Sequence, residues 1–222
     1  MLLTLDTATQ FASIALYDGE WVLAELNWRT ARRHTVELAP QVDNLLALAD
    51  VTPEQITALA VSIGPGSYTG TRIALSYAKG VALARNLPLI GVPTLDILVY
   101  PHLPVLEPVC AMVAAGRGRY AWALYDTGDR IGDKYFPRRY TKYQINNIAE
   151  ILLQLEPPIM FVGEVDARGR RDIRQAWEED WIDLISPALA VRRGGALAEL
   201  AWQRLQAGDV DDPVSLSPIY LR

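Results

Sequence analysis

The chain has 222 residues, half of them hydrophobic, which is enough for two compact domains. Its 21 basic and 26 acidic residues give a net charge of −5, which excludes the broad positive field of an autonomous nucleic-acid-binding protein. The single cysteine, Cys110, excludes an intramolecular disulfide, and its apolar neighbours predict a buried thiol in a reducing compartment. Without a signal-like N-terminus or an apolar run of membrane-spanning length, a cytoplasmic protein with no membrane contact is expected.

The first half of the chain predicts three strands followed by alternating helices and strands. Apolar runs with an Asp-Gly turn predict an antiparallel meander over residues 2–28. Helical spacing of apolar residues then predicts a helix that begins near Val36 or Glu37, where Pro40 falls close to the first turn, and ends at Ala49. Further elements are a strand at 57–63, a helix at 69–84, a strand at 88–92 and a short helix at 94–100.

A proline-rich segment at 100–108 reads as a linker, after which the same order of elements begins again. Strands are expected at 108–115, 120–126, 131–137, 159–163 and 181–185, with helices at 142–155, 166–178 and 191–206. This order predicts two α/β domains, 1–103 and 104–222, each a mixed five-stranded sheet with helices. The layout is that of the duplicated ribonuclease-H-like fold shared by actin, hexokinases and Hsp70 chaperones, the actin-like ATPase or ASKHA fold.

A glycine-rich loop follows the strand at 57–63 and contains Gly64, Gly66, Ser67, Thr69 and Gly70. It matches neither the phosphate-binding P-loop nor the dinucleotide fingerprint, because its glycine spacing is wrong for both and Thr71-Arg72 stands where the P-loop has Lys-Ser or Lys-Thr. The pattern favours a structural turn that positions the next helix, with Ser67 or Thr69 as its cap. A ligand-binding loop stays open as the alternative.

The helix at 69–84 carries two apolar strips, whereas one sheet face requires only one. Gly70, Ala74 and Ala78 form a smooth strip, and Ile73, Tyr77, Val81 and Ala84 form an adjacent apolar strip. Together with the helix at 36–49, this helix is expected either to present an apolar face to a matching helix pair or to be sandwiched within its own domain. The candidate interface residues are Leu38, Gln41, Val42, Leu45, Gly70, Ile73, Ala74, Tyr77, Ala78 and Val81, with Gly64, Gly66, Ser67, Thr69 and Arg72 in the adjacent loop.

Catalytic machinery is not evident in the sequence. In the actin-like layout, a turn after the first strand of each domain grips ATP. Here the first turn has Ala8 in place of the glycine that lets the backbone approach phosphate, and the second, 114–119, has no carboxylate. The only histidines, His34 and His102, lack metal-ligand spacing. No catalytic residue, metal site or cofactor is therefore predicted, and short basic clusters such as Arg192-Arg193 are interpreted as solvated surface.

Five segments resemble the bacterial TsaB (YeaZ) family of tRNA threonylcarbamoyladenosine biosynthesis: "LTLDTAT", "RRHTVELAPQVDNLL", "AVSIGPGSYTGTRIALSYAKGVA", "LIGVPTLDIL" and the terminal "SPIYLR" with Pro218, Tyr220 and Arg222. The resemblance implies a non-catalytic, actin-like partner of the enzyme TsaD, which modifies adenosine 37 of tRNAs that read ANN codons. It implies that the helices at 36–49 and 69–84 form a four-helix bundle with TsaD, and that the ATPase TsaE docks on the pair. A homodimer through the same face is expected when TsaD is absent, and tRNA is expected to be bound only indirectly.

The turn at 114–119 departs from the family, because neutral and basic residues replace its acidic pair. Two alternatives stay open: an active ATP-dependent kinase or ATPase of the same fold, and, more weakly, a metallopeptidase. A nucleotide shared at the junction with TsaD also stays open.

Overall fold

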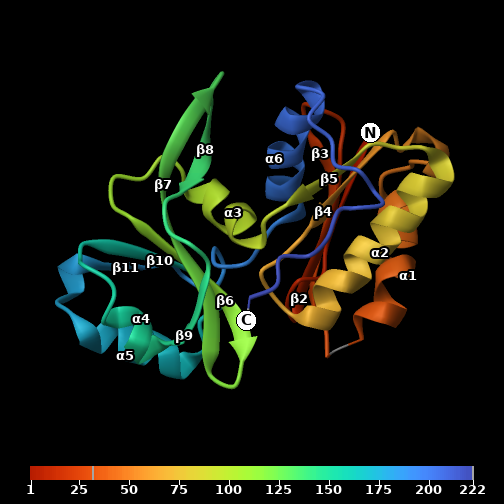
Figure 1. Cartoon of the computed structure of the whole chain (residues 1–222). Helices are drawn as coiled ribbons and strands as arrows, with labels where there is room; N and C mark the ends of the chain where they lie inside the picture. The colour runs from red at the N-terminus through yellow and green to blue at the C-terminus, as the bar shows by residue number, and fades with distance from the viewer. Residues whose placement is uncertain (32, 222) are drawn as a thin grey trace. The chain divides into compact units, whose positions relative to one another are not determined.

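The computed structural model describes residues 1–31 and 33–221 (Figure 1). Arg32 and Arg222, which belong to two of the segments quoted above, lie outside the described residues. The chain divides into two compact units, Met1–Ile97 with Arg192–Tyr220, and Leu98–Val191 with Leu221. Within the described residues, no helix has the length and apolar character needed to cross a lipid bilayer.

The first unit is built on a five-stranded sheet in the order β3-β2-β1-β4-β5. Its first strand pairs antiparallel with β2 and parallel with β4, as the meander and crossover pattern predicts. All five residues of β1 are buried, which fits a central strand covered on both faces. The strands are β1 (Leu2–Asp6), β2 (Phe11–Tyr17), β3 (Val22–Arg29), β4 (Ala58–Ser62) and β5 (Leu89–Val92).

Helices α1 and α2 lie side by side on one face of this sheet, and α6 lies on the other (Figure 1). Leu38, Val42 and Leu45 of α1 pack in the same core as Ala74 and Ala78 of α2. The helices of this unit are α1 (His34–Leu48), α2 (Tyr68–Arg85), α6 (Gly194–Gln206) and the short 3-10 helix η1 (Pro53–Gln55). Helix α3 (Thr94–Val99) begins in this unit and ends in the second, and the 3-10 helix η2 (Tyr100–His102) belongs to the second unit. The first helix begins at His34, slightly earlier than expected, and contains Pro40.

The second unit has a six-stranded sheet in the order β11-β10-β6-β7-β8, with β9 also paired to β7. Its strands are β6 (Val109–Gly116), β7 (Arg119–Ile131), β8 (Lys134–Arg139), β9 (Gln144–Asn147), β10 (Ile159–Gly163) and β11 (Ile182–Leu184). Its helices are α4 (Ile148–Leu152), α5 (Ala167–Ala176) and the 3-10 helix η3 (Glu179–Trp181). Trp122, Phe161, Ile151 and Ile173 are among the buried side chains of its core.

Two predictions about these units are corrected by the structure. The expected helix at 142–155 is shorter, because Asn147 caps α4 and starts it at Ile148. The residues before it form β9, a strand that was not expected and that brings the sheet from five strands to six. The expected domain 104–222 loses its last helix, since α6 packs on the first sheet and belongs to the first unit. Gly194 permits this packing, because a Cβ there would lie 2.9 Å from the Ala15 Cβ.

Candidate functional site

The turn after β1, residues 6–9, is where the actin-like layout places a nucleotide-gripping carboxylate. Here the Asp6 Oδ2 accepts a hydrogen bond from the Arg192 Nε at 2.6 Å, and both side chains are only 1% exposed. The Asp6 Oδ1 accepts from the Ala8 amide at 2.8 Å. Both carboxylate oxygens therefore have partners within the protein.

Arg192 also braces the rest of this turn. Its Nη2 donates to the Thr9 Oγ1 at 3.0 Å and to the Phe11 carbonyl at 2.7 Å. The interpretation of Arg192 as solvated surface is therefore wrong, because its guanidinium is buried against the Asp6 turn. No local sequence signal pairs it with Asp6, which lies 186 residues away in the chain. Arg193 is the exposed neighbour and forms an ion pair with Glu25.

The glycine-rich loop closes directly onto the same turn. The Ser67 amide donates to the Ala8 carbonyl at 2.6 Å, and a Cβ on Gly66 would come within 2.4 Å of that oxygen. A Cβ on Gly70 would lie 2.2 Å from the Thr7 carbonyl oxygen. These two glycines therefore allow backbone to touch backbone, and the loop amide at Ser67 is occupied by the protein's own chain.

Thr7 fastens the start of α2 to this turn. Its hydroxyl donates to the Gly70 carbonyl at 2.6 Å and accepts from the Ala74 amide at 3.1 Å. The Ser67 side chain caps the helix by accepting from the Gly70 amide at 3.2 Å. This geometry supports the interpretation of the loop as a device that positions a helix. The contribution of Thr7 was not predicted from the sequence.

A groove of about 540 Å³ runs between α1 and α2 on the side away from the sheet. Half-exposed Ile73 and Tyr77 contribute to its wall, and buried Leu38 contributes to its lining. Both helices also carry large exposed apolar side chains, Val36 on α1 and Tyr68 on α2. The lining residues are Thr35, Leu38, Ala39, Tyr68, Thr69, Arg72, Ile73, Ser76 and Tyr77.

The structure divides the predicted interface residues into two groups. Six are buried in the first unit and cannot form the surface of a docking face: Leu38 only lines the groove, and Val42, Leu45, Gly70, Ala74 and Ala78 pack inside. The strip of Gly70, Ala74 and Ala78 faces the sheet, because α2 needs small residues where it approaches the Asp6 turn and β4. The four that stay accessible are Gln41, Ile73, Tyr77 and Val81.

The loop residues are divided in the same way. Gly64 is buried and has a positive φ of 95°, and Gly66 is half-buried. Ser67, Thr69 and Arg72 are exposed at the start of α2. Thr69 and Arg72 therefore line the groove, whereas Gly64 and Gly66 give the loop its turn geometry.

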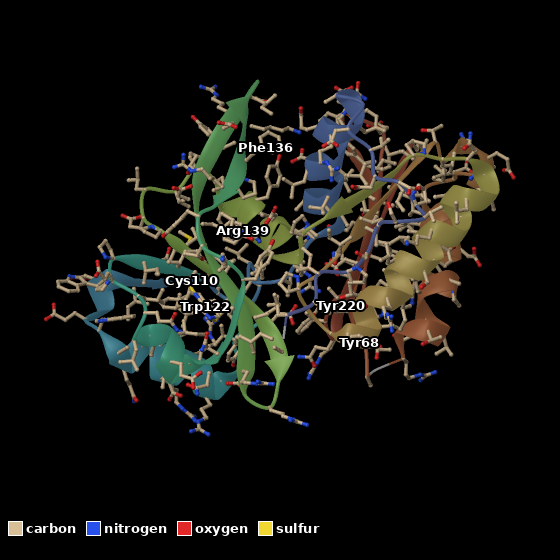
Figure 2. The ribbon with its side chains drawn as sticks, viewed as in Figure 1. Tyr68, Cys110, Trp122, Phe136, Arg139 and Tyr220 are labelled. Carbon is tan, nitrogen blue, oxygen red and sulfur yellow. The ribbon has the colours of Figure 1, made fainter. Side chains whose placement is uncertain are left out.

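The C-terminal tail runs beside the same end of α2. The Ile219 amide donates to the Ile63 carbonyl at 2.7 Å, which places Tyr220 against Tyr68 with ring centroids 5.1 Å apart (Figure 2). The Arg72 guanidinium lies over the Tyr68 ring at 4.4 Å. The family resemblance includes Tyr220 but implies no role for it, and the structure places its ring in this aromatic cluster beside the groove.

In the second unit, the turn between β6 and β7 is a two-residue hairpin turn. Arg117 and Gly118 both have positive φ, 56° and 69°, which is the geometry of a type I′ turn. The turn residues are exposed, and Cys110 lies deep in the sheet that precedes them. Burial raises the pKa of the Cys110 thiol far above its ordinary range, which makes it a poor nucleophile at neutral pH.

The two histidines lie apart from any cluster of metal-ligating groups. Among the described residues, no group of three or more His, Cys, Asp or Glu side chains is arranged to hold a metal ion. His34 is buried at the start of α1. Burial lowers the pKa of His34, against a smaller raising effect of a hydrogen bond to the Thr9 backbone.

Comparison with known proteins places this arrangement in a family. Residues 28–161 match the family model described as "TsaD: tRNA N6-adenosine threonylcarbamoyltransferase". The TsaB of Escherichia coli is 36% identical over 126 residues, covering 56% of this chain but only 54% of that protein. The TsaB of Bacillus subtilis is 28% identical over 162 residues, covering 73% of this chain and 70% of that protein.

A solved structure described as "YeaZ from Pseudomonas aeruginosa" has the same fold. It superposes with a TM-score of 0.79 at 24% identity and covers 99% of both chains. The element order predicted from the sequence, two ribonuclease-H-like α/β units, is thus found in a solved relative. The chain belongs to the family that the TsaD model describes and, within it, to the TsaB (YeaZ) group.

Proposed function

We propose that this protein acts in the biosynthesis of threonylcarbamoyladenosine in tRNA as a non-catalytic partner of a TsaD enzyme. The observation that carries the proposal is the groove between α1 and α2, which offers an accessible, mostly apolar docking face on a rigid helix pair. The names of the relatives, "tRNA threonylcarbamoyladenosine biosynthesis protein TsaB", supply the pathway. The reaction itself, at adenosine 37 of tRNAs that read ANN codons, is assigned to TsaD.

The chemistry of the groove suits a helical protein partner. Tyr68, Arg72 and Tyr77 line one side, and tyrosine and arginine are the residue types that most often dominate the energy of protein interfaces. Ile73 supplies an apolar contact between them, and Ser76 is small enough for a close helix approach. A pair of apolar helices on the partner would complete a four-helix bundle.

The non-catalytic part of the proposal is supported by the Asp6 turn. A carboxylate that positions a metal ion or a water must present an oxygen lone pair to that ligand, and the Asp6 side chain is only 1% exposed. Both Asp6 oxygens are engaged, one by the Arg192 guanidinium and one by the Ala8 amide. The methyl group of Ala8 further occupies the place where a phosphate would approach the backbone.

We extend the proposal to two assemblies. When TsaD is absent, a homodimer through the same groove would cover its apolar residues. The ATPase TsaE would dock on the complex of this chain with TsaD, as the family resemblance implies. We also place the protein in the cytoplasm, where tRNA modification takes place.

The test is complex formation with the TsaD of the same organism, followed by size-exclusion chromatography with light scattering. Ser76→Arg puts a long charged side chain into the groove from an exposed position, so it should abolish the complex while leaving the fold intact. Ser186→Arg makes the same change at an exposed position of the second unit and should bind normally. A wild-type chain that fails to bind TsaD, or equal binding by both variants, overturns the proposed docking face.

A further inference from the structure

The strands β7 and β8 form a hairpin that extends past the rest of the second sheet (Figure 1). The pairing of β7 with β6 ends at Tyr125, and from there to Ile131 the strand pairs only with β8. The base of the hairpin is fixed by Arg138, whose Nε and Nη2 donate to the two oxygens of Asp126 at 2.8 and 2.7 Å. The hairpin is therefore an ordered surface feature with a defined side-chain arrangement.

This segment carries a net positive charge, whereas the whole protein carries a net negative charge. Residues 126–143, which include Asp126 at the base of the hairpin, contain five basic and three acidic residues, whereas the whole chain has a net charge of −5. The same segment contains four aromatic residues, and Tyr140 is 48% exposed. Basic and aromatic side chains are thus interspersed along the hairpin and the segment that follows it: Arg130, Lys134, Tyr135, Phe136, Arg138, Arg139, Tyr140, Lys142 and Tyr143.

Two guanidinium groups in the segment lie over tyrosine rings. The Arg139 guanidinium carbon is 3.8 Å from the centroid of Tyr143, and that of Arg130 is 5.4 Å from the centroid of Tyr135. Alternation along β8 puts Tyr135 and Arg139 on the same side of the strand, about 13 Å apart at 3.3 Å per residue. By the same alternation Phe136 points to the opposite side, and its ring centroid lies 5.9 Å from that of Tyr100.

Backbone hydrogen bonds hold the stack of Arg139 on Tyr143 in place. The Tyr140 amide donates to the Leu124 carbonyl at 3.1 Å, and the Leu124 amide donates to the Thr141 Oγ1 at 2.8 Å. These bonds tie the chain between Arg139 and Tyr143 to β7. Both stacks are thus pre-organised by strand pairing, which lowers the entropy lost when a ligand binds.

We propose that this hairpin surface, defined by Arg130, Tyr135, Arg139, Lys142 and Tyr143, binds a single-stranded segment of RNA. Arginine and lysine neutralise the phosphates, while tyrosine rings and guanidinium planes stack on unpaired bases. The spacing of the two stacks suits a strand of several nucleotides rather than a single phosphate. The choice of RNA rests on the proposed role in tRNA modification. The net charge predicted that tRNA is bound only through a partner, and the hairpin surface would add a direct contact with RNA.

The test uses the full chain and two RNA probes, a fluorescein-labelled 20-nucleotide oligouridine and an unmodified tRNA transcript, with binding followed by fluorescence anisotropy. The double variant Arg130→Ala/Arg139→Ala should weaken binding of both probes at least ten-fold. It should also reduce the slope of log affinity against log salt by about 1.4, since each neutralised phosphate contributes about 0.7 for single strands. The matched control, Arg168→Ala/Arg171→Ala, removes the same charge from exposed positions of α5 and should stay within two-fold of wild type.

Tyr135→Leu separates stacking from charge. It keeps the net charge and an apolar side chain, and it should weaken binding about five-fold or more with an unchanged salt slope. Equal losses in the hairpin and α5 variants, or no RNA binding by wild type, overturn the proposal. So does a hairpin variant that binds RNA normally but no longer binds TsaD, since the surface would then serve an acidic protein. Loss of the Ser76→Arg effect on TsaD binding, with RNA binding intact, would instead refute only the docking face.

Discussion

The guanidinium of Arg192 and the carboxylate of Asp6 form a fully buried ion pair at 2.6 Å, joining residues from the two ends of the chain. Removing one member of a buried pair leaves the other charge without a partner in a site from which water is excluded. This pair therefore has two consequences: it holds the start of α6 against the first sheet, and it engages the carboxylate that stands where the actin-like layout has a nucleotide-gripping one.

Arg192→Met should destabilise the protein strongly, by about 3–5 kcal/mol, because it leaves the buried Asp6 carboxylate without a compensating positive charge. The double variant Asp6→Asn/Arg192→Met removes both charges and should recover at least half of that loss. Arg193→Met breaks a more exposed pair with Glu25 and should cost no more than about 1 kcal/mol. Urea unfolding followed by circular dichroism measures all three, and equal losses for Arg192→Met and Arg193→Met would refute the buried role.

Gly70→Ala should destabilise the protein by about 2 kcal/mol or more, because the new methyl group would collide with the Thr7 carbonyl oxygen. Gly80→Ala is the matched control in the same helix, where a Cβ meets nothing within 4 Å. It should stabilise the protein by about 0.5–1 kcal/mol through better helix propensity. Thermal and urea unfolding distinguish the two, and similar effects at both positions would contradict the close approach of α2 to the Asp6 turn.

The free energy of unfolding should fall as pH is lowered from 7.5 to 5.5. Burial lowers the pKa of both His34 and His102, so the unfolded chain takes up their protons first as pH drops below 6.5. Each histidine contributes at most about 1.4 kcal/mol per pH unit in that window. The variant His34→Gln/His102→Gln should show a clearly smaller loss between the two pH values in urea unfolding. An unchanged loss would assign the pH dependence to other groups.

The Cys110 thiol should be inert to thiol reagents in the native protein. Its side chain is fully buried, and burial raises its pKa, so neither the thiolate nor access is available. Labelling with Ellman's reagent should be at least a hundred-fold slower in buffer than in 6 M guanidinium chloride. Rapid stoichiometric labelling of the folded protein would show that the second sheet opens easily around β6.

The order of elements was predictable because each has a local signal. The Asp-Gly turn and the alternating apolar runs fix the first meander, and the helical spacing of Leu38, Val42 and Leu45 marks α1. The strand β9 was missed because Ile145, Ile148 and Ile151 also fit a helical spacing. Only the pairing of Ile145 with Ala121 of β7 shows that Ile145 lies in a strand. The placement of α6 was missed for a similar reason, since its partner strands lie at the other end of the chain.

The candidate site was only partly predictable. The two helices were expected, and the structure buries Gly70, Ala74 and Ala78 inside the first unit, which is the sandwiched alternative that the sequence left open. A strip of small residues fits a partner helix and an internal close contact equally well, and the hydrogen bonds from Thr7 decide for the latter. The role of Arg192 depends on a contact between distant segments, which no local pattern encodes.

The measurement that tests the central claim most directly is a reconstituted tRNA threonylcarbamoyladenosine assay read by mass spectrometry of the nucleosides. The folded double variant Asp6→Asn/Arg192→Met, which lacks the carboxylate of the β1 turn, should support the same modification rate as wild type, whereas Ser76→Arg should support none. A double variant that folds and binds TsaD but supports no modification would contradict the account, because Asp6 would then take part in the chemistry.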